Sequence, residues 1–153
     1  MSVQLLHDLY LFKDLLPEEL ASLSALAKVR TYNRDEEIFK AGEPAQSLFV
    51  IRHGTVKIRF AGKDADIEVA QLGTGAHFGE MSFVDGQARS ATAVALEKSE
   101  LLEIGFDALR MFFDKNPTTG MRFYRSLSHF LAGRLRITTT DLSFSREKNI
   151  RHF

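Results

Sequence analysis

The sequence contains no cysteine and no tryptophan, and its 20 basic residues are matched by 20 acidic ones. Without cysteine the chain can form no disulfide, no thiolate zinc site and no cysteine nucleophile. A formal net charge of zero gives no overall attraction for a polyanion, which argues against nucleic acid as a partner. No uninterrupted apolar run approaches the ~18 residues of a membrane-spanning helix or the ~7–15 of a signal-peptide core. We therefore expect a cytoplasmic protein that binds neither nucleic acid nor membrane.

At 153 residues the chain has the length of one domain. The spacing of its apolar and turn residues changes twice along the sequence. Residues 1–28 form the expected helical lead-in. From 29 to 105, short β-branched and aromatic runs alternate with turn residues at intervals of about 8–12 positions, which is typical of an antiparallel sandwich or barrel. Residues 106–145 return to helical spacing, with a break at Asn116–Pro117 because the residue before proline avoids the α region. The predicted fold class is α+β: an antiparallel β-roll or jelly roll flanked by N-terminal helices and a C-terminal helical pair.

One segment of the β region, which reads FGEMSFVDGQARSATA from Phe78, combines groups that suit a sugar phosphate. Gly79 lets main-chain amides approach a ligand closely, and a helix start presents unpaired N–H groups to an anion. The Arg89 guanidinium offers a planar fork of donors suited to phosphate oxygens. An ionised Glu80 can only accept hydrogen bonds, so it requires a donor such as a hydroxyl. A ligand with a phosphate at one end of a sugar and free hydroxyls at the other satisfies both side chains.

This segment resembles the phosphate-binding cassette of the cyclic nucleotide-binding domain family, which here spans residues 78–92. The surrounding framework is similar too, because EIF at 37–39, AGEP at 41–44, LFVI at 48–51, GTVKI at 54–58 and LGTG at 72–75 match the family's strands and glycine turns. The resemblance covers about residues 8–142 and points to the bacterial effector domains of catabolite activator-like proteins, without their helix-turn-helix. It implies that the chain is a ligand-binding sensor and not an enzyme. Such a sensor needs no cofactor and binds cyclic AMP or, as second choice, cyclic GMP.

The resemblance also implies which residues bind the ligand. Arg89 would pair with the exocyclic oxygens of the cyclic phosphate, and Glu80 would contact the ribose 2′-hydroxyl. The remaining ligand-binding candidates are Phe78, Gly79, Met81, Ser82, Ser90 and Ala91 in the cassette, and Thr138 and Thr139 on the last helix, where family members contact the adenine. A serine at position 90, in place of the threonine associated with cyclic GMP, leans toward cyclic AMP.

Each of these candidates also has a simpler interpretation. Arg89 could be a surface arginine paired with Asp85 or Glu80, and Glu80 could be a helix-start carboxylate stabilised by local amides. Thr138 and Thr139 could be solvated helix residues, because the helix carries an insertion relative to the transcription factors of the family. The histidines are scattered, at His7, His53, His77, His129 and His152, without an HxH pair, so no metal site is expected. His77 abuts the cassette, and its charge could tune binding near neutral pH.

Ligand binding is expected to shift the population between two arrangements of the C-terminal helices, with Phe83, Leu101 and the Phe112–Phe113 face as the moving contacts. The apolar stripe of the last helix favours a homodimer, although the stripe could instead pack back on the sandwich. The partner that receives the signal is an unknown protein. Two alternatives stay open: an interaction module that has the fold but binds no nucleotide, and the regulatory segment of a larger enzyme.

Overall fold

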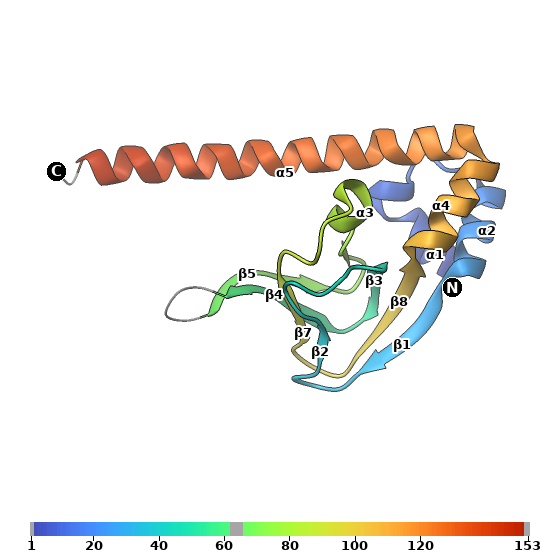
Figure 1. Ribbon diagram of the computed structural model, residues 1–153, viewed down its shortest axis with the longest axis horizontal. Helices are drawn as coiled ribbons and strands as arrows, with labels where there is room; N and C mark the ends of the chain where they lie inside the picture. The colour runs from blue at the N-terminus through green and yellow to red at the C-terminus, as the bar shows by residue number, and fades with distance from the viewer. Residues whose placement is uncertain (1, 62–65, 152–153) are drawn as a thin grey trace.

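The computed structural model describes residues 2–61 and 66–151, with side chains described for residues 3–60 and 67–137. Its strands are β1 Lys28–Tyr32, β2 Glu37–Phe39, β3 Ser47–His53, β4 Thr55–Ala61, β5 Asp66–Gly73, β6 His77–Phe78, β7 Thr92–Ala95 and β8 Ser99–Gly105. They form two four-stranded sheets, in the orders β1-β8-β3-β6 and β2-β7-β4-β5, and the paired strands are antiparallel. The predicted antiparallel roll is confirmed, and Figure 1 shows it beneath a long helix.

The helices are α1 Ser2–His7, the short 3₁₀ helix η1 Tyr10–Phe12, α2 Pro17–Leu26, α3 Met81–Asp85, α4 Phe106–Lys115 and α5 Pro117–Arg151. The N-terminal lead-in consists of helices, as expected, and is divided into three short pieces that end at Leu26. A new helix begins at Pro17 because proline tolerates the first helical position, and the Glu19 carboxylate accepts a hydrogen bond from the amide of Leu16 at 2.7 Å. As expected, α4 ends before Asn116, and Pro117 begins α5.

The central strand β3 is apolar on both faces because each face covers a different core. Along β3, Leu48 and Val50 point toward the helices, whereas Phe49 and Ile51 point into the space between the sheets. This alternation follows from the two-residue period of a strand. Leu101 on β8 belongs to the core between the sheets, so the expectation that it contacts the last helices is wrong.

The helical core joins the cassette helix α3 to the C-terminal helices. Phe83 of α3 lies 5.2 Å from Phe106 and 5.9 Å from Phe123, measured between ring centroids, and it stacks on Tyr124. Phe123 is fully buried and also stacks on Phe113 at 4.7 Å. Through these aromatic contacts, α3 packs directly against both α4 and α5.

The base of α5 is tied to the N-terminal helices by a polar cluster. Arg122 donates hydrogen bonds to both carboxylate oxygens of Glu19, at 2.6 and 2.5 Å, and the Thr119 hydroxyl donates to the same carboxylate. Farther along, Ser126 donates to Asp14 at 3.2 Å. These contacts fix the first turns of α5 against α2 and its neighbours.

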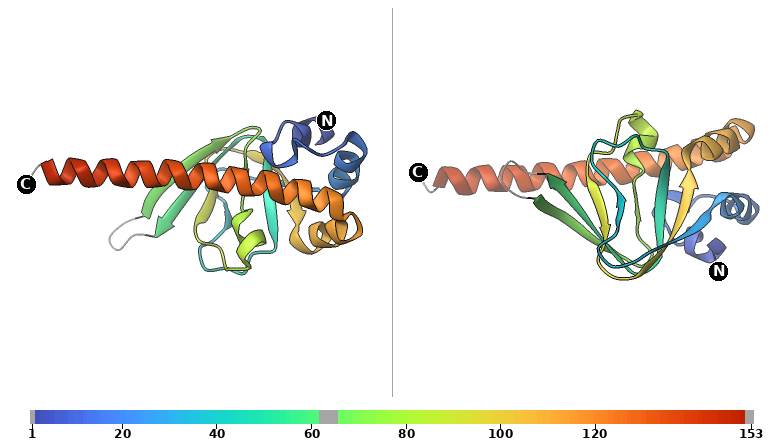
Figure 2. Two further views of the ribbon diagram at one scale, coloured as in Figure 1. Left: turned by 90° about the horizontal axis from the view of Figure 1, so that it is seen from above. Right: turned by 60° about the horizontal axis from the view of Figure 1, so that its bottom comes forward.

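The distal part of α5 extends beyond the helical base and passes over the β-roll, as the two views in Figure 2 agree. Its 35 residues correspond to a length of about 52 Å. Leu127 is buried in the helical core, whereas Leu135 and Ile137 are 67 % and 65 % exposed. Among the described residues, no helix has both the length and the hydropathy that a membrane span requires.

Candidate functional site

The cassette is a tight excursion between β6 and β7 that two glycines permit. Gly79 has a φ of +87°, which L side chains rarely adopt, and it turns the chain out of β6 toward α3. Gly86, with a φ of +68°, ends α3, and its amide donates to the carbonyl of Ser82. The amide of Arg89 then donates to the carbonyl of Glu43 at 2.9 Å. This path brings Gly79, Glu80 and Arg89 to one side of the roll.

Arg89 is buried, with 7 % of its surface exposed, and its guanidinium faces carbonyl groups and rings. Nη1 donates to the Gly79 carbonyl at 3.0 Å, and Nη2 donates to the Ser47 carbonyl at 2.5 Å. The guanidinium carbon lies 4.0 Å from the centre of the Phe39 ring, in a cation–π contact. The alternative of a surface arginine paired with Asp85 or Glu80 is therefore wrong.

The positive charge of Arg89 is only partly compensated by its surroundings. Carbonyl oxygens accept its hydrogen bonds without neutralising it, and Nε has no hydrogen-bond partner within the described part of the chain. Burial lowers the pKa of this guanidinium from its ordinary value, while the carboxylates of Glu103, Glu43 and Glu80 act in the opposite direction. Arginine nevertheless stays protonated in proteins, so the site holds a desolvated cation that an anionic ligand would stabilise.

Glu80 is the opposite case, a buried carboxylate that lacks donors. It is 1 % exposed, and neither carboxylate oxygen has a hydrogen-bond partner among the described residues. Its neighbours are cationic or titratable: the His77 Nδ1 atom lies 3.4 Å from Oε2, and the Arg134 Nη1 atom of α5 lies 4.0 Å from Oε1. Burying an ionised carboxylate without hydrogen bonds is costly. The carboxylate therefore has unused acceptor sites for a hydroxyl donor.

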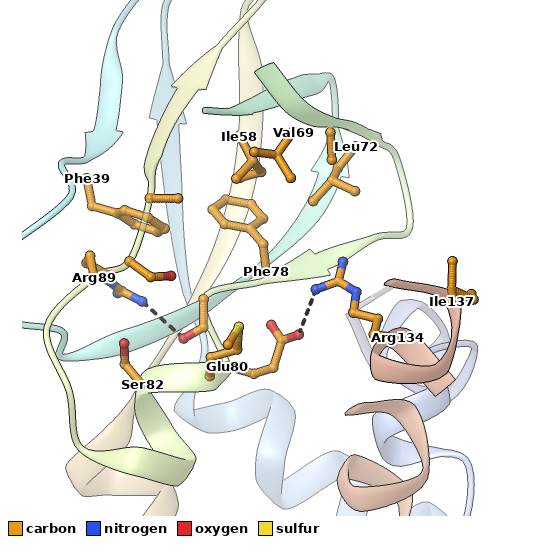
Figure 3. A pocket seen from close by; sticks show the side chains of 15 residues that line it. Phe39, Ile58, Val69, Leu72, Phe78, Glu80, Ser82, Arg89, Arg134 and Ile137 are labelled. Atoms are coloured by element: carbon orange, nitrogen blue, oxygen red, sulfur yellow. Dashed lines mark hydrogen bonds and ion pairs between the residues drawn. The ribbon is translucent and has the colours of Figure 1, made fainter. Parts of the chain in front are cut away.

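These side chains line one cavity of about 470 Å³, within the size range of small-molecule sites. Figure 3 shows Glu80 between Arg89 and Arg134, with Ile58, Val69, Leu72 and Phe78 forming an apolar side. Arg134 and Ile137 reach the cavity from α5. The cavity thus combines a cation, a carboxylate and an apolar wall, and α5 covers part of its opening.

The structure brings together all eight candidates of the cassette. The cavity is lined by Phe78, Gly79, Glu80, Met81, Ser82, Arg89, Ser90 and Ala91. Ser90 is exposed, whereas Ala91 is buried beneath the cavity surface. Thr138 and Thr139 lie in α5, but their side chains fall outside the described residues, so their contact with a base stays a prediction. Within the described part of the chain, no cluster of three or more histidine, aspartate or glutamate residues could hold a metal ion.

The cavity is also lined by seven residues that the sequence analysis did not single out: Phe39, Ile58, Val69, Ala70, Leu72, Arg134 and Ile137. The strand residues could not have been found, because ordinary core alternation produces the same pattern. Arg134, by contrast, could have been found from the sequence. It stands four residues before the candidate Thr138, and residues four apart share one face of a helix.

Three comparisons with known proteins agree on the family. The sequence profile of the cyclic nucleotide-binding domain matches residues 29–116. Glutaminase 1 of Bradyrhizobium diazoefficiens is 33 % identical over 125 residues, which are 82 % of this chain and 20 % of the glutaminase. The cyclic AMP receptor protein of Thermus thermophilus is 32 % identical over 145 residues, covering 91 % of this chain and 64 % of the receptor.

Among solved structures, the crystal structure of the Thermus thermophilus catabolite activator protein has a TM-score of 0.79 and 31 % sequence identity. It covers 89 % of this chain, and the chain covers 62 % of it. The present chain therefore spans between a fifth and about two thirds of the length of these relatives.

Proposed function

Since the chain belongs to the cyclic nucleotide-binding domain family, we propose that its cavity binds a cyclic nucleotide, cyclic AMP first and cyclic GMP second, and that binding is sensed by the C-terminal helices. One observation carries this proposal. Within the described residues, the guanidinium of Arg89 is buried without a hydrogen-bonded carboxylate, the carboxylate of Glu80 is buried without a hydrogen-bond donor, and both line the same cavity. A cyclic nucleotide supplies both missing partners, an anion for Arg89 and a ribose hydroxyl for Glu80.

The proposed contacts follow from the chemistry of these groups. Arg89 binds the exocyclic phosphate oxygens, and Ser90, exposed beside it, offers a hydroxyl to the same group. Glu80 accepts a hydrogen bond from the 2′-hydroxyl. The base lies against Ile58, Val69 and Leu72, because an apolar wall suits a purine face.

Selectivity between the two nucleotides depends on few polar groups. Ser90 favours cyclic AMP on the strength of the resemblance, and the name of the Thermus receptor supports the same choice. Thr138 and Thr139 are proposed to contact the adenine from α5. They continue the helix beyond Arg134 and Ile137, which line the cavity.

The proposed signal is a change in the position of α5. Ligand at Glu80 competes with the Arg134 contact at 4.0 Å, and a shift of α3 is transmitted through Phe83 to Phe123 and Tyr124. A ligand moves such an equilibrium only by its difference in affinity for the two arrangements. Coupling of about 1–3 kcal/mol is ordinary for such devices.

We also propose a cytoplasmic homodimer that signals to an unidentified protein and has no DNA contact or catalytic activity of its own. The exposed Leu135 on the distal part of α5 supports a helix–helix contact there, on a face other than the one that Ile137 turns to the cavity. Light scattering at tens of micromolar chain tests this: a mass of twice 17.3 kDa is expected, and a monomer mass would exclude the dimer.

Two other functions remain to be tested against this proposal. The first is a regulatory segment of a larger enzyme, which is favoured by the match to a fifth of a glutaminase. The other is an interaction module that binds no nucleotide. Thermal unfolding with cyclic AMP, cyclic GMP and, as a control, linear 5′-AMP separates the module from the sensor. Ligand at a thousand times its Kd adds about 4 kcal/mol, or roughly 8–16 °C in Tm. No rise with either cyclic nucleotide at millimolar concentration would favour the module.

A further inference from the structure

His77 occupies the space between the carboxylate of Glu80 and helix α5. It is 8 % exposed, and its Nδ1 atom lies 3.4 Å from Oε2 of Glu80 and has no hydrogen-bond partner among the residues that the structure describes. Its ring lies 4.7 Å from the ring of Phe130 on α5, between centroids. Buried polar groups are usually hydrogen-bonded, so a small movement of the imidazole toward the Glu80 carboxylate would satisfy both groups with one hydrogen bond.

The charge on this imidazole depends on few other groups. Among the residues whose side chains are described, the charged and titratable groups near it are Glu80, Arg134 on α5, Tyr10 on η1 behind Phe130, and the Arg52–Glu100 ion pair on the adjacent strands β3 and β8. Arg52 and Glu100 lie 3.0 Å apart and largely offset each other.

We propose that His77 is the positioning residue for Glu80 and that binding of a cyclic nucleotide in this cavity takes up a proton at His77. This inference rests on the proposed function. In the free protein the cations Arg89 and Arg134 already lie around Glu80. The ligand adds a negative phosphate to the cavity. This added negative charge favours an imidazolium that donates to Glu80 and holds it toward the 2′-hydroxyl.

The direction of the pH effect follows from this proton uptake. A ligand that binds together with a proton binds more tightly as the pH falls. Affinity for cyclic AMP should therefore rise by about three- to tenfold from pH 8 to pH 6, the range in which histidine changes charge. The cyclic phosphodiester keeps its single negative charge across this range, so the ligand itself contributes no such change.

The test is calorimetric titration of the full chain with cyclic AMP at pH 6, 7 and 8. His77→Gln keeps a donor beside Glu80 but cannot be charged, so its affinity should match that of the wild type at pH 8 and stay constant with pH. His77→Phe keeps the ring against Phe130 but loses the donor, so it should bind more weakly at every pH. His53→Gln, at the exposed end of β3, is the matched control and should keep the wild-type profile.

The outcomes separate this inference from the proposed function. If the wild type binds cyclic AMP with an affinity that does not change between pH 6 and 8, or if His77→Gln keeps the wild-type slope, the role of His77 is wrong while the function stands. If the wild type binds neither cyclic nucleotide at any pH, both are wrong. NMR titration of the wild-type imidazole, free and saturated with cyclic AMP, gives the same answer without a variant: the midpoint should move to higher pH, and an unmoved midpoint would overturn the proposal.

Discussion

A hydrogen bond of 3.0 Å joins Nη1 of Arg89 to the carbonyl oxygen of Gly79, ten residues earlier in the chain. The bond forms because Gly79 has no side chain: a Cβ there would lie 2.8 Å from the same Nη1 atom. Glycine is thus required at position 79 both for its φ of +87° and for the space that the guanidinium occupies.

Gly79→Ala should therefore remove cyclic nucleotide binding. The new methyl group displaces Arg89, and the positive φ adds about 1–2 kcal/mol of backbone strain. Gly75→Ala is the matched control, since Gly75 has a φ of +89° but no atom within 4 Å of its added Cβ. Both variants should unfold at lower temperature, yet only Gly79→Ala should lose affinity in a calorimetric titration. Equal affinities in the two variants would contradict the close approach of Arg89 to Gly79.

Glu80→Gln should reduce discrimination at the sugar without destabilising the free protein. The substitution removes a buried charge that has no hydrogen-bond donor, so Tm without ligand should be at least as high as in the wild type. A hydrogen bond to a charged group contributes about 1.5–3 kcal/mol. The wild type should accordingly prefer cyclic AMP over its 2′-deoxy analogue by about tenfold or more, and the variant should show little preference. An undiminished preference would mean that Glu80 does not contact the 2′-hydroxyl.

Phe83→Leu should weaken the response of α5 to ligand more than it weakens binding. Phe83 contacts the rings of Phe123 and Tyr124 but does not line the cavity. The loss of shape complementarity should cost about 1–3 kcal/mol of stability. Hydrogen exchange with and without cyclic AMP measures the response. The control is Val84→Ala on the exposed side of α3, which should respond as the wild type does. A full response in Phe83→Leu would exclude this route.

Arg122→Ala should destabilise the protein, because it leaves the Glu19 carboxylate without its main partner. Glu19 and Arg122 are 13 % and 24 % exposed, so solvent screens them only partly, and a loss of about 1–3 kcal/mol is expected. Lys40→Ala is the control: it removes an ion pair with Glu37 at the surface and should change stability by less than about 1 kcal/mol. Denaturant unfolding of both variants measures the difference. A similar effect in both would mean that the cluster does not anchor α5.

The sequence predicted the fold because its local signals agree with the global arrangement. The break at Asn116–Pro117, the glycine turns and the alternating strand residues each restrict the backbone, and together they are compatible with one roll. The N-terminal lead-in was predicted less well. Its division into α1, η1 and α2 depends on packing against α5. Leu20 and Leu23 belong to this helical core, but their spacing in the sequence does not reveal where the helices break.

The part of the candidate site that lies in one continuous segment was predicted from the sequence. Residues 78–91 are close in sequence, so their spacing alone indicates a shared cavity. Arg134 comes from a helix more than forty positions later, and which face of α5 meets the cavity is decided by the aromatic packing of Phe123 and Phe130. The acceptors of Arg89 were also beyond the sequence, because the Ser47 and Gly79 carbonyls belong to the backbone.

The most direct measurement is a calorimetric titration of cyclic AMP into the wild type and Arg89→Ala, with Arg34→Ala in an exposed loop as the control. Removing one partner of a buried charge pair costs roughly 2–5 kcal/mol, so Arg89→Ala should bind at least about thirtyfold more weakly, while Arg34→Ala binds as the wild type does. Thermal unfolding verifies that each variant is folded. If folded Arg89→Ala binds cyclic AMP as tightly as the wild type, the phosphate does not lie against this guanidinium, and the account of the site is wrong.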